Sequence, residues 1–242
     1  MQNQKVLGIL GGLGPMATAY FYELVIAHTQ AGCDQEHIDM VISSKATTPD
    51  RTAFIVGASQ SDPFAVMEKE AERLVAFGAE VIAIPCNTAH YFYTRLRQAI
   101  PVPILNMVED TVDKAKAMGC RKLGILATDG TIHTETYQRV CGEKGMLCAA
   151  PDEEGQKKIM SVIYDNIKQG RPPDIQRFLA ASYGLFSQGC DMIVLGCTEL
   201  SLVKKQGLLD KRYIDSMDVL AEQAILACGK TPVGFEWEVP DE

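Results

Sequence analysis

The chain has 242 residues, a hydrophobic fraction of 47% and a net charge of -8 at pH 7. A chain of this length allows one large or two modest α/β domains with a substantial core. The acidic balance and the lack of a long basic run argue against nucleic acid or an anionic membrane as partner, because phosphate binding needs clustered Lys and Arg.

No apolar stretch approaches the roughly 20 residues that span a bilayer, and the start of the chain does not resemble a signal peptide. We therefore expect a cytoplasmic protein whose eight cysteines are free thiols. No pair of cysteines has C-x-x-C spacing, so neither a zinc ribbon nor a thioredoxin-like site is supported, and no metal site is predicted.

Short apolar runs that end at a glycine or a polar turn predict strands at residues 6–10, 40–42, 81–84, 104–105, 122–127, 146–149, 192–195 and 213–214. Apolar residues at helical spacing predict helices at residues 15–32, 64–77, 89–98, 132–144, 157–168, 175–188 and 217–228. The long polar segment 43–63 shows no clear element, which is uncommon unless such a segment serves a site.

Two βαβ series run in the same order, one starting at Leu7-Gly8-Ile9-Leu10 and the other at Leu123-Gly124-Ile125-Leu126. Ordered self-similarity of this kind is typical of a duplicated unit. We therefore expect an α/β fold of two similar, pseudo-duplicated parallel-sheet domains with the active site in the cleft between them. The first domain would contain residues 1–102 plus 213–242, and the second would contain residues 103–212.

Each series ends in a strand that delivers a cysteine, in Pro85-Cys86-Asn87-Thr88 and in Gly196-Cys197-Thr198-Glu199. The carboxyl ends of parallel strands are where ligands bind in such sheets. A thiolate on one side of a carbon and a thiol on the other could take and return a proton, and so invert that carbon. Backbone N–H groups at the following helix starts could stabilise the thiolate.

Three other interpretations of these residues remain open. The two cysteines could simply pack, or Cys86 could pair with His90 as a cysteine–histidine hydrolase, although a polar neighbour at the cleft rim is the favoured role for His90. The pattern Gly12-x-Gly14-x-x-Ala17 after the first strand suggests a dinucleotide-binding fingerprint. That fingerprint needs an acidic residue after the second strand, where this chain has Ser43-Ser44-Lys45.

Three motifs together resemble the aspartate/glutamate racemase superfamily, and most closely its cofactor-independent aspartate racemases: Gly11-Gly12-Leu13-Gly14-Pro15, Pro85-Cys86-Asn87-Thr88-Ala89-His90 and Gly196-Cys197-Thr198-Glu199. The resemblance implies an isomerase that interconverts L- and D-aspartate, with glutamate as a further candidate substrate. It also implies a homodimer that uses no pyridoxal phosphate or other cofactor, with Cys86 and Cys197 as the catalytic acid–base pair.

The same resemblance implies the substrate-binding residues. Those matching groups that bind the α-carboxylate and amino group are Asn87, Thr88, Thr128 and Thr198. Arg51 resembles the arginine that meets the side-chain carboxylate, and an arginine fork suits that task. Lys168 is a second cation for that carboxylate and the weakest match, because Lys157 and Lys158 lie nearby.

Gly12, His90 and Glu199 are expected around the site without touching the reacting atoms. Glu199 stands where the glutamate racemases usually have a histidine, which favours the aspartate branch. The carboxylate of Glu199 could tune the thiol of Cys197 or cap a helix start.

Related activities remain as alternatives within the resemblance: hydantoin racemase, maleate isomerase and arylmalonate decarboxylase. A non-catalytic dicarboxylate-binding protein on the same fold is a further alternative. Two cysteines together with Arg51 favour racemisation of a dicarboxylic amino acid over these.

Overall fold

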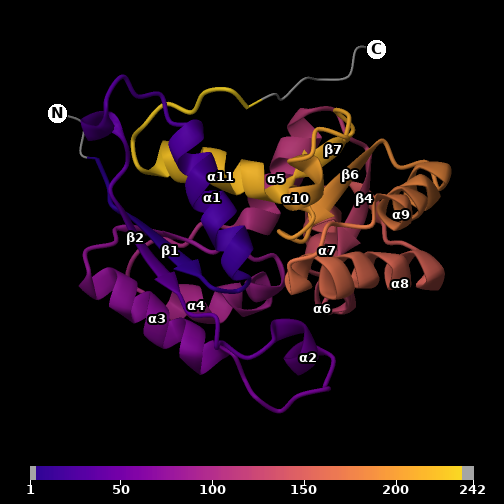
Figure 1. The fold of residues 1–242 in the computed structure, drawn as a ribbon, viewed down its shortest axis with the longest axis horizontal. Coiled ribbons are helices and arrows are strands. Elements are labelled where there is room, and N and C mark those ends of the chain that lie inside the picture. Colours follow the sequence, from indigo (N-terminus) through magenta and orange to yellow (C-terminus); the bar gives the residue numbers. More distant parts are fainter. Residues whose placement is uncertain (1–3, 236–242) are drawn as a thin grey trace. The chain divides into compact units, whose positions relative to one another are not determined.

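The computed structural model describes residues 4–235 and divides into two units, each with its own parallel sheet (Figure 1). The first unit contains the described residues up to Met107 and those from Met217 onward, and the second unit contains Val108–Ser216. The predicted fold class, a duplicated parallel α/β architecture, is confirmed.

The elements of the first unit are β1 (Leu7–Gly11), α1 (Pro15–Ala27), the 3₁₀ helix η1 (Asp34–Glu36), β2 (Met40–Ser44), α2 (Arg51–Ile55), α3 (Phe64–Ala76), β3 (Val81–Ala83), the 3₁₀ helix η2 (Thr88–Phe92), α4 (Tyr93–Ala99) and α11 (Ser216–Ala227). Helices α1 and α11 cover one face of the sheet, and α3 and α4 cover the other (Figure 1). Each face has its own core, so the strands are apolar on both sides, as buried parallel strands are.

The elements of the second unit are α5 (Met107–Ala117), β4 (Lys122–Ala127), α6 (Asp129–His133), α7 (Thr136–Glu143), β5 (Leu147–Ala149), α8 (Glu153–Ser161), the π-helical turn η3 (Val162–Asn166), the 3₁₀ helix η4 (Ile167–Gln169), α9 (Ile175–Ser187), β6 (Met192–Gly196), α10 (Ser201–Lys204) and β7 (Tyr213–Asp215). Helices α8 and α9 pack on one face of this sheet through a core that includes Ile159, Phe178 and Leu195.

The two sheets repeat one strand order. The first sheet is β2-β1-β3 and the second is β5-β4-β6-β7, with every pair of strands parallel. An isolated parallel bridge joins Ile82 of β3 to Ile104, so residue 104 occupies the place in the first sheet that β7 has in the second. The duplication expected from the repeated strand motifs therefore extends to the outer position of each sheet.

The glycines of the repeated Leu-Gly-Ile-Leu motif have a packing role. A Cβ at Gly8 would lie 2.8 Å from the Cβ of Ala79, and a Cβ at Gly124 would lie 3.1 Å from Leu185 of α9. In each unit the glycine lets the segment that leads into the cysteine strand pack directly on the central strand.

Several predicted helices differ from the observed ones. The helix expected at 132–144 is divided into α6 and α7 at Glu135, whose backbone is left-handed with φ 50°. The helix expected at 157–168 begins earlier, at Glu153, because Asp152 accepts a hydrogen bond from the N–H of Gly155 at 2.7 Å and so caps it. Helix α5 was not predicted, and α2 lies inside the polar segment that was expected to lack an element.

The boundaries of the two units also differ from those expected. Residues 103–107 stay with the first unit because Ile104 bridges to β3, and Tyr213–Asp215 belong to the second unit because β7 pairs with β6. The expected return of the last helix to the first unit is observed, since Leu220 and Ile225 of α11 lie in the first unit's core.

The tail that follows α11 is anchored at its start. Thr29 bridges to Pro232, and Phe235 stacks on His28 with 4.1 Å between ring centroids. The rest of the tail, from residue 236, lies outside the described residues.

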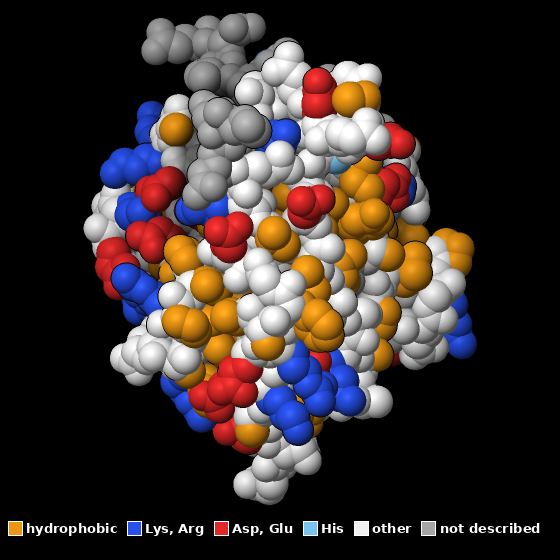
Figure 2. Space-filling view, turned by 90° about the vertical axis from the view of Figure 1, so that its left-hand side faces the viewer, with side chains coloured by type: hydrophobic (Ala, Val, Ile, Leu, Met, Phe, Trp, Pro, Cys, Tyr) orange, Lys and Arg blue, Asp and Glu red, His pale blue; other side chains and the backbone are white. Residues whose placement is uncertain are grey.

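Strand β2 forms one edge of the first sheet. Its Ile42 is exposed, as is Phe77 at the end of α3. Figure 2 shows hydrophobic side chains gathered in the middle of this side of the unit, with charged side chains around them. Among residues 4–235, no helix combines the length and apolar character needed to cross a membrane.

Candidate functional site

Two equivalent strands each lead directly into a buried cysteine. Cys86 follows β3, and its N–H donates to the carbonyl of Ile84 at 2.7 Å, which makes a tight turn around Pro85. Cys197 follows β6 immediately. The exposed fractions are 6% for Cys86 and 5% for Cys197. Each unit therefore presents one thiol at the carboxyl end of the corresponding strand, where parallel sheets bind ligands.

His90 is a buried structural neighbour of Cys86. Its Nδ1 lies 2.9 Å from the Cys86 carbonyl, and its Nε2 lies 3.1 Å from the N–H of Met107. A carbonyl only accepts and an N–H only donates, so Nδ1 carries the proton and Nε2 accepts. Burial lowers the pKa of His90 below its ordinary value. The imidazole is therefore neutral with both nitrogens bound to backbone, and neither is free to act as a base for a Cys86 thiol.

Asn87 and Thr88 lie in the turn from β3 into η2, and both are buried. Their position at the first residues of a helical segment brings backbone N–H groups close to the Cys86 motif. Such groups favour a nearby negative charge, whether on a thiolate or on a substrate carboxylate.

Cys197 belongs to a chain of three side chains within the second unit. Its Sγ donates to Oε2 of Glu199 at 2.9 Å, and Oε1 of Glu199 lies 3.2 Å from Nζ of Lys168. The hydroxyl of Thr198 also donates to Oε2 of Glu199, at 3.4 Å. Helix α10 begins two residues after Glu199 with Leu200 as its N-cap, so the carboxylate of Glu199 contacts the thiol rather than capping this helix.

The surroundings of Cys197 hold its proton on the sulfur. Burial raises the pKa of Cys197 well above its ordinary value, and the negative charge of Glu199 raises it further. The ammonium of Lys168 acts in the opposite direction. In this structure, Cys197 is therefore a thiol that donates a hydrogen bond.

Lys168 lies beyond the end of α8, where the π-helical turn η3 and the 3₁₀ helix η4 change the helical register. Its Nζ lies 5.1 Å from the centre of the Tyr164 ring. This π turn is of a kind that often occurs at functional sites. It brings Lys168 to the carboxylate of Glu199, and a substrate carboxylate at this ammonium would have to share it.

Arg51 is the first residue of α2 and is buried, with 6% exposed. Its Nη1 donates to the carbonyls of Thr48 and Pro49, and its Nη2 donates to the carbonyl of Leu13. Its buried Nε has no hydrogen-bond partner, and no acidic side chain in residues 4–235 pairs with it. The Nε–H and one Nη2–H remain as donors, and guanidinium N–H groups suit a carboxylate.

Gly12 shapes the turn that Arg51 holds. Its φ is +81°, and a Cβ there would lie 2.4 Å from the backbone nitrogen of Lys45. The N–H of Gly12 donates to the hydroxyl of Thr18 at 2.9 Å. The dinucleotide-like pattern therefore serves a close approach between the turn after β1 and the segment after β2.

Thr128 follows β4 and caps α6 by accepting from the N–H of Thr131. Its hydroxyl also lies 3.2 Å from that of Thr131. Thr131 was not among the residues expected at the site, and it occupies the position that Pro15 has in the first repeat. A hollow of 410 Å³ borders this turn and is lined by residues that include Asp129, Gln156, Met160 and Tyr164.

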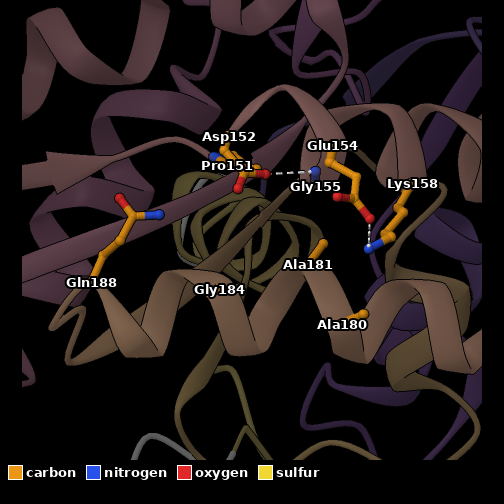
Figure 3. A pocket seen from close by; sticks show the side chains of 9 residues that line it. All are labelled: Pro151, Asp152, Glu154, Gly155, Lys158, Ala180, Ala181, Gly184 and Gln188. Carbon is orange, nitrogen blue, oxygen red and sulfur yellow. Dashed lines mark hydrogen bonds and ion pairs between the residues drawn. The ribbon is translucent and has the colours of Figure 1, made fainter.

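A second hollow lies between α8 and α9 (Figure 3). Ala180, Ala181 and Gly184 line it on α9, and the Glu154–Lys158 ion pair lies at the α8 side (Figure 3). None of the site residues predicted from the sequence lines this hollow. Within the part of the chain that the structure describes, no group of three or more His, Cys, Asp or Glu could hold a metal ion.

Comparisons with known proteins identify the family of the chain. The family model described as Asp/Glu/Hydantoin racemase matches residues 10–224. The broad specificity amino-acid racemase RacX of Bacillus subtilis is 30% identical over 226 residues, which cover 91% of this chain and 96% of that protein.

Solved structures show the same fold. The aspartate racemase of Picrophilus torridus superposes with a TM-score of 0.79 at 26% identity, covering 95% of this chain and 96% of the other. An aspartate racemase homologue from Pyrococcus horikoshii superposes with a TM-score of 0.74 at 23% identity, covering 93% and 99%. The chain belongs to the Asp/Glu/hydantoin racemase family and is an isomerase of the amino-acid racemase type.

Proposed function

We propose that this protein racemises aspartate, with glutamate as a further substrate, by proton transfer between two thiols and the α-carbon. The observation that carries the proposal is the equivalence of Cys86 and Cys197. Each follows the corresponding strand of a duplicated sheet, and each is followed by a threonine within two residues. A duplicated unit that delivers the same reactive group twice suits a reaction whose two directions are mirror images.

In the proposed reaction, the thiolate of one cysteine takes the α-proton from one face of the substrate. The resulting carbanion then takes a proton from the thiol of the other cysteine, on the opposite face. The first cysteine finishes as a thiol and the second as a thiolate, so the reverse direction uses them in exchanged roles. Both steps are general acid–base transfers, and no cofactor is needed to balance them.

Arg51 is the proposed ligand of the substrate's second carboxylate. Three backbone carbonyls orient its guanidinium without neutralising the positive charge. The buried Nε–H still lacks an acceptor, which a carboxylate would supply. Lys168 would act as a second cation while it remains paired with Glu199.

The hydroxyl and amide groups that follow the strands are the proposed ligands of the α-carboxylate and amino group: Asn87, Thr88, Thr128 and Thr198. All four are buried at the carboxyl ends of β3, β4 and β6. The relatives indicate the range of substrates to test, since one is described as a broad specificity amino-acid racemase and another as an aspartate racemase.

The test is a panel of D- and L-aspartate, D- and L-glutamate, D- and L-alanine, a hydantoin and maleate, incubated with the protein in D₂O. Chiral chromatography and mass spectrometry follow inversion and deuterium uptake at the α-carbon. We expect aspartate to racemise with deuterium in the product and alanine to react far more slowly. Cys86→Ala and Cys197→Ala should each reduce racemisation by about 10³-fold or more.

Cys33→Ala is the matched control, because it removes an exposed cysteine outside both motifs. Full racemisation by both site variants would rule out the two-thiol mechanism. Conversion of the hydantoin or maleate in place of aspartate would assign one of the related activities. Thermal stabilisation by aspartate without deuterium uptake would identify a binding protein.

A further inference from the structure

We propose that Glu199, held by Lys168, keeps the proton on Cys197 in the resting enzyme and so makes the two thiols unequal before substrate binds. Cys197 then meets the first substrate as the proton donor, and Cys86 is the base for that enantiomer. Glu199 is a positioning residue, because it acts through Cys197 and does not touch the substrate. This inference rests on the proposed racemase function.

The geometry assigns a separate contact to each oxygen of Glu199. Oε2 accepts from the Cys197 thiol at 2.9 Å and from the Thr198 hydroxyl at 3.4 Å, while Oε1 faces the Lys168 ammonium at 3.2 Å. The Glu199 side chain is only 8% exposed, and that of Lys168 is 22% exposed. With the Lys168 ammonium on one oxygen, the carboxylate of Glu199 presents its other oxygen as the acceptor for the thiol proton.

The charged groups that act on the Cys197 thiol are Glu199, from the turn after β6, and Lys168, from the middle of η4. Tyr164 lies against Lys168 through its ring. The negative carboxylate opposes formation of a thiolate, and the ammonium favours it. The two charges therefore set how firmly Cys197 keeps its proton, and changing one should have the opposite effect to changing the other.

The two cysteine motifs differ in whether a charged side chain follows the cysteine. Cys86 is followed at the matching position by Thr88, which carries no charge, and His90 of the same motif is neutral and binds backbone groups. The duplication therefore supplies two thiols, and Glu199 distinguishes them. During turnover the α-proton goes to Cys86, and the Cys197 proton goes to the opposite face. The enzyme must then return a proton to Cys197 before it meets the same enantiomer again.

The test measures thiolate formation at Cys197 without substrate. The ultraviolet absorbance of the thiolate is titrated in wild type minus Cys197→Ala, and likewise in each variant minus its own Cys197→Ala double variant. In Glu199→Gln, we expect the midpoint to fall by about one pH unit or more, because the opposing charge is removed. In Lys168→Met, we expect the midpoint to rise, because the favourable charge is removed.

Glu143→Gln is the matched control, since Glu143 is an exposed carboxylate of the same unit that pairs with Arg139. A structural role for Glu199 would move neither titration. An unchanged midpoint in Glu199→Gln, or shifts of the same sign in both site variants, would overturn the proposal. If Glu199→Gln does not fold, as judged by circular dichroism, an unchanged midpoint in Lys168→Met overturns it.

Kinetics give a second readout. The equilibrium constant of racemisation is unity, so kcat/KM for the two enantiomers must stay equal in every variant. A preference for one resting form instead shows as unequal kcat values, with KM values that differ by the same ratio. We expect the wild-type ratio of the two kcat values to move at least twofold toward unity in Glu199→Gln. A shifted titration with an unchanged ratio would overturn the ordering of the thiols. Absence of racemisation across the panel would instead refute the proposed function and leave the titration interpretable.

Discussion

At Gly12 the backbone leaves no room for a side chain. The positive φ of +81° disfavours any L-residue, and a Cβ at this position would lie 2.4 Å from the backbone nitrogen of Lys45. Backbone cannot move aside as a flexible side chain can. This glycine therefore determines how closely the turn after β1 approaches the segment after β2, and Arg51 spans the same turn through the Leu13 carbonyl.

Replacing Gly12 by alanine should destabilise the first unit by about 2–4 kcal/mol, through conformational strain plus overlap with the Lys45 backbone. Gly57→Ala separates the two effects, because Gly57 has φ +77° but nothing within 4 Å of its Cβ position. The Gly57→Ala control should lower the free energy of unfolding by only about 1 kcal/mol. Urea unfolding measures both, and equal losses would show that overlap at Gly12 contributes nothing.

At the scale of helices and strands, several contacts and breaks involve residues whose structural role the sequence pattern does not indicate. His90 holds Met107 within the first unit by binding the Cys86 carbonyl through one nitrogen and the Met107 N–H through the other. Glu135 divides a continuous helical pattern into α6 and α7, and η3 changes the register between α8 and Lys168. At Glu135 and at η3 the pattern of apolar residues is that of a continuous helix, and it does not predict the break.

The link through His90 should make stability depend on pH. Burial lowers its pKa in the folded protein, so as pH falls below 6.5 the unfolded chain binds a proton first. The free energy of unfolding then falls by up to about 1.4 kcal/mol per pH unit until the folded pKa is reached. His90→Gln should cost about 1–3 kcal/mol near neutral pH through lost hydrogen bonds. The free energy of unfolding of this variant should lack the decrease at acid pH that protonation of His90 causes.

Denaturant unfolding from about pH 7.5 to about pH 5.5 measures this difference. The gap between wild type and His90→Gln should narrow as the pH falls. His133→Gln serves as a control for loss of an exposed imidazole, and it should change stability by less than about 0.5 kcal/mol near neutral pH. A gap that stays constant over this range would show that His90 does not titrate with folding.

The chain passes between the two units twice, and each passage leads into a helix. After Ile104 the chain enters the second unit through α5, and after β7 it returns to the first unit through α11. Met217, Leu220 and Ile225 of α11 complete the core that Leu7 and Ile9 of β1 begin. The first unit is therefore incomplete until the last helix has been added.

This connectivity predicts which of the two units a core mutation destabilises. Ile225→Ala, which truncates a fully buried side chain of α11, should destabilise the first unit by about 2–5 kcal/mol. Amide hydrogen exchange should then rise in β1 more than in β4, although β4 is nearer to residue 225 in the sequence. Leu200→Ala, at a fully buried position in the second unit's core, should show the reverse. Equal acceleration in both strands for both variants would contradict the division into two units.

The parallel α/β class, the duplication and the two cysteine-bearing strands were predictable from the chain alone. These features follow from local patterns: apolar runs of strand length, helical spacing, glycines at element ends and a repeated motif. Helix α5 was missed because its apolar residues are few and its first turn is acidic, with Glu109 and Asp110. The polar segment hid α2, which begins where the Asp50 side chain caps it.

Tertiary structure alone placed Lys168 against Glu199 and bound both nitrogens of His90. Lys168 and Glu199 are far apart in sequence, and their contact depends on a π turn that no apolar pattern encodes. Whether Glu199 caps a helix or holds a thiol proton depends on which polar atoms lie within about 3 Å. Periodicity reports which face of an element is buried, whereas a hydrogen bond depends on the position of single atoms after packing.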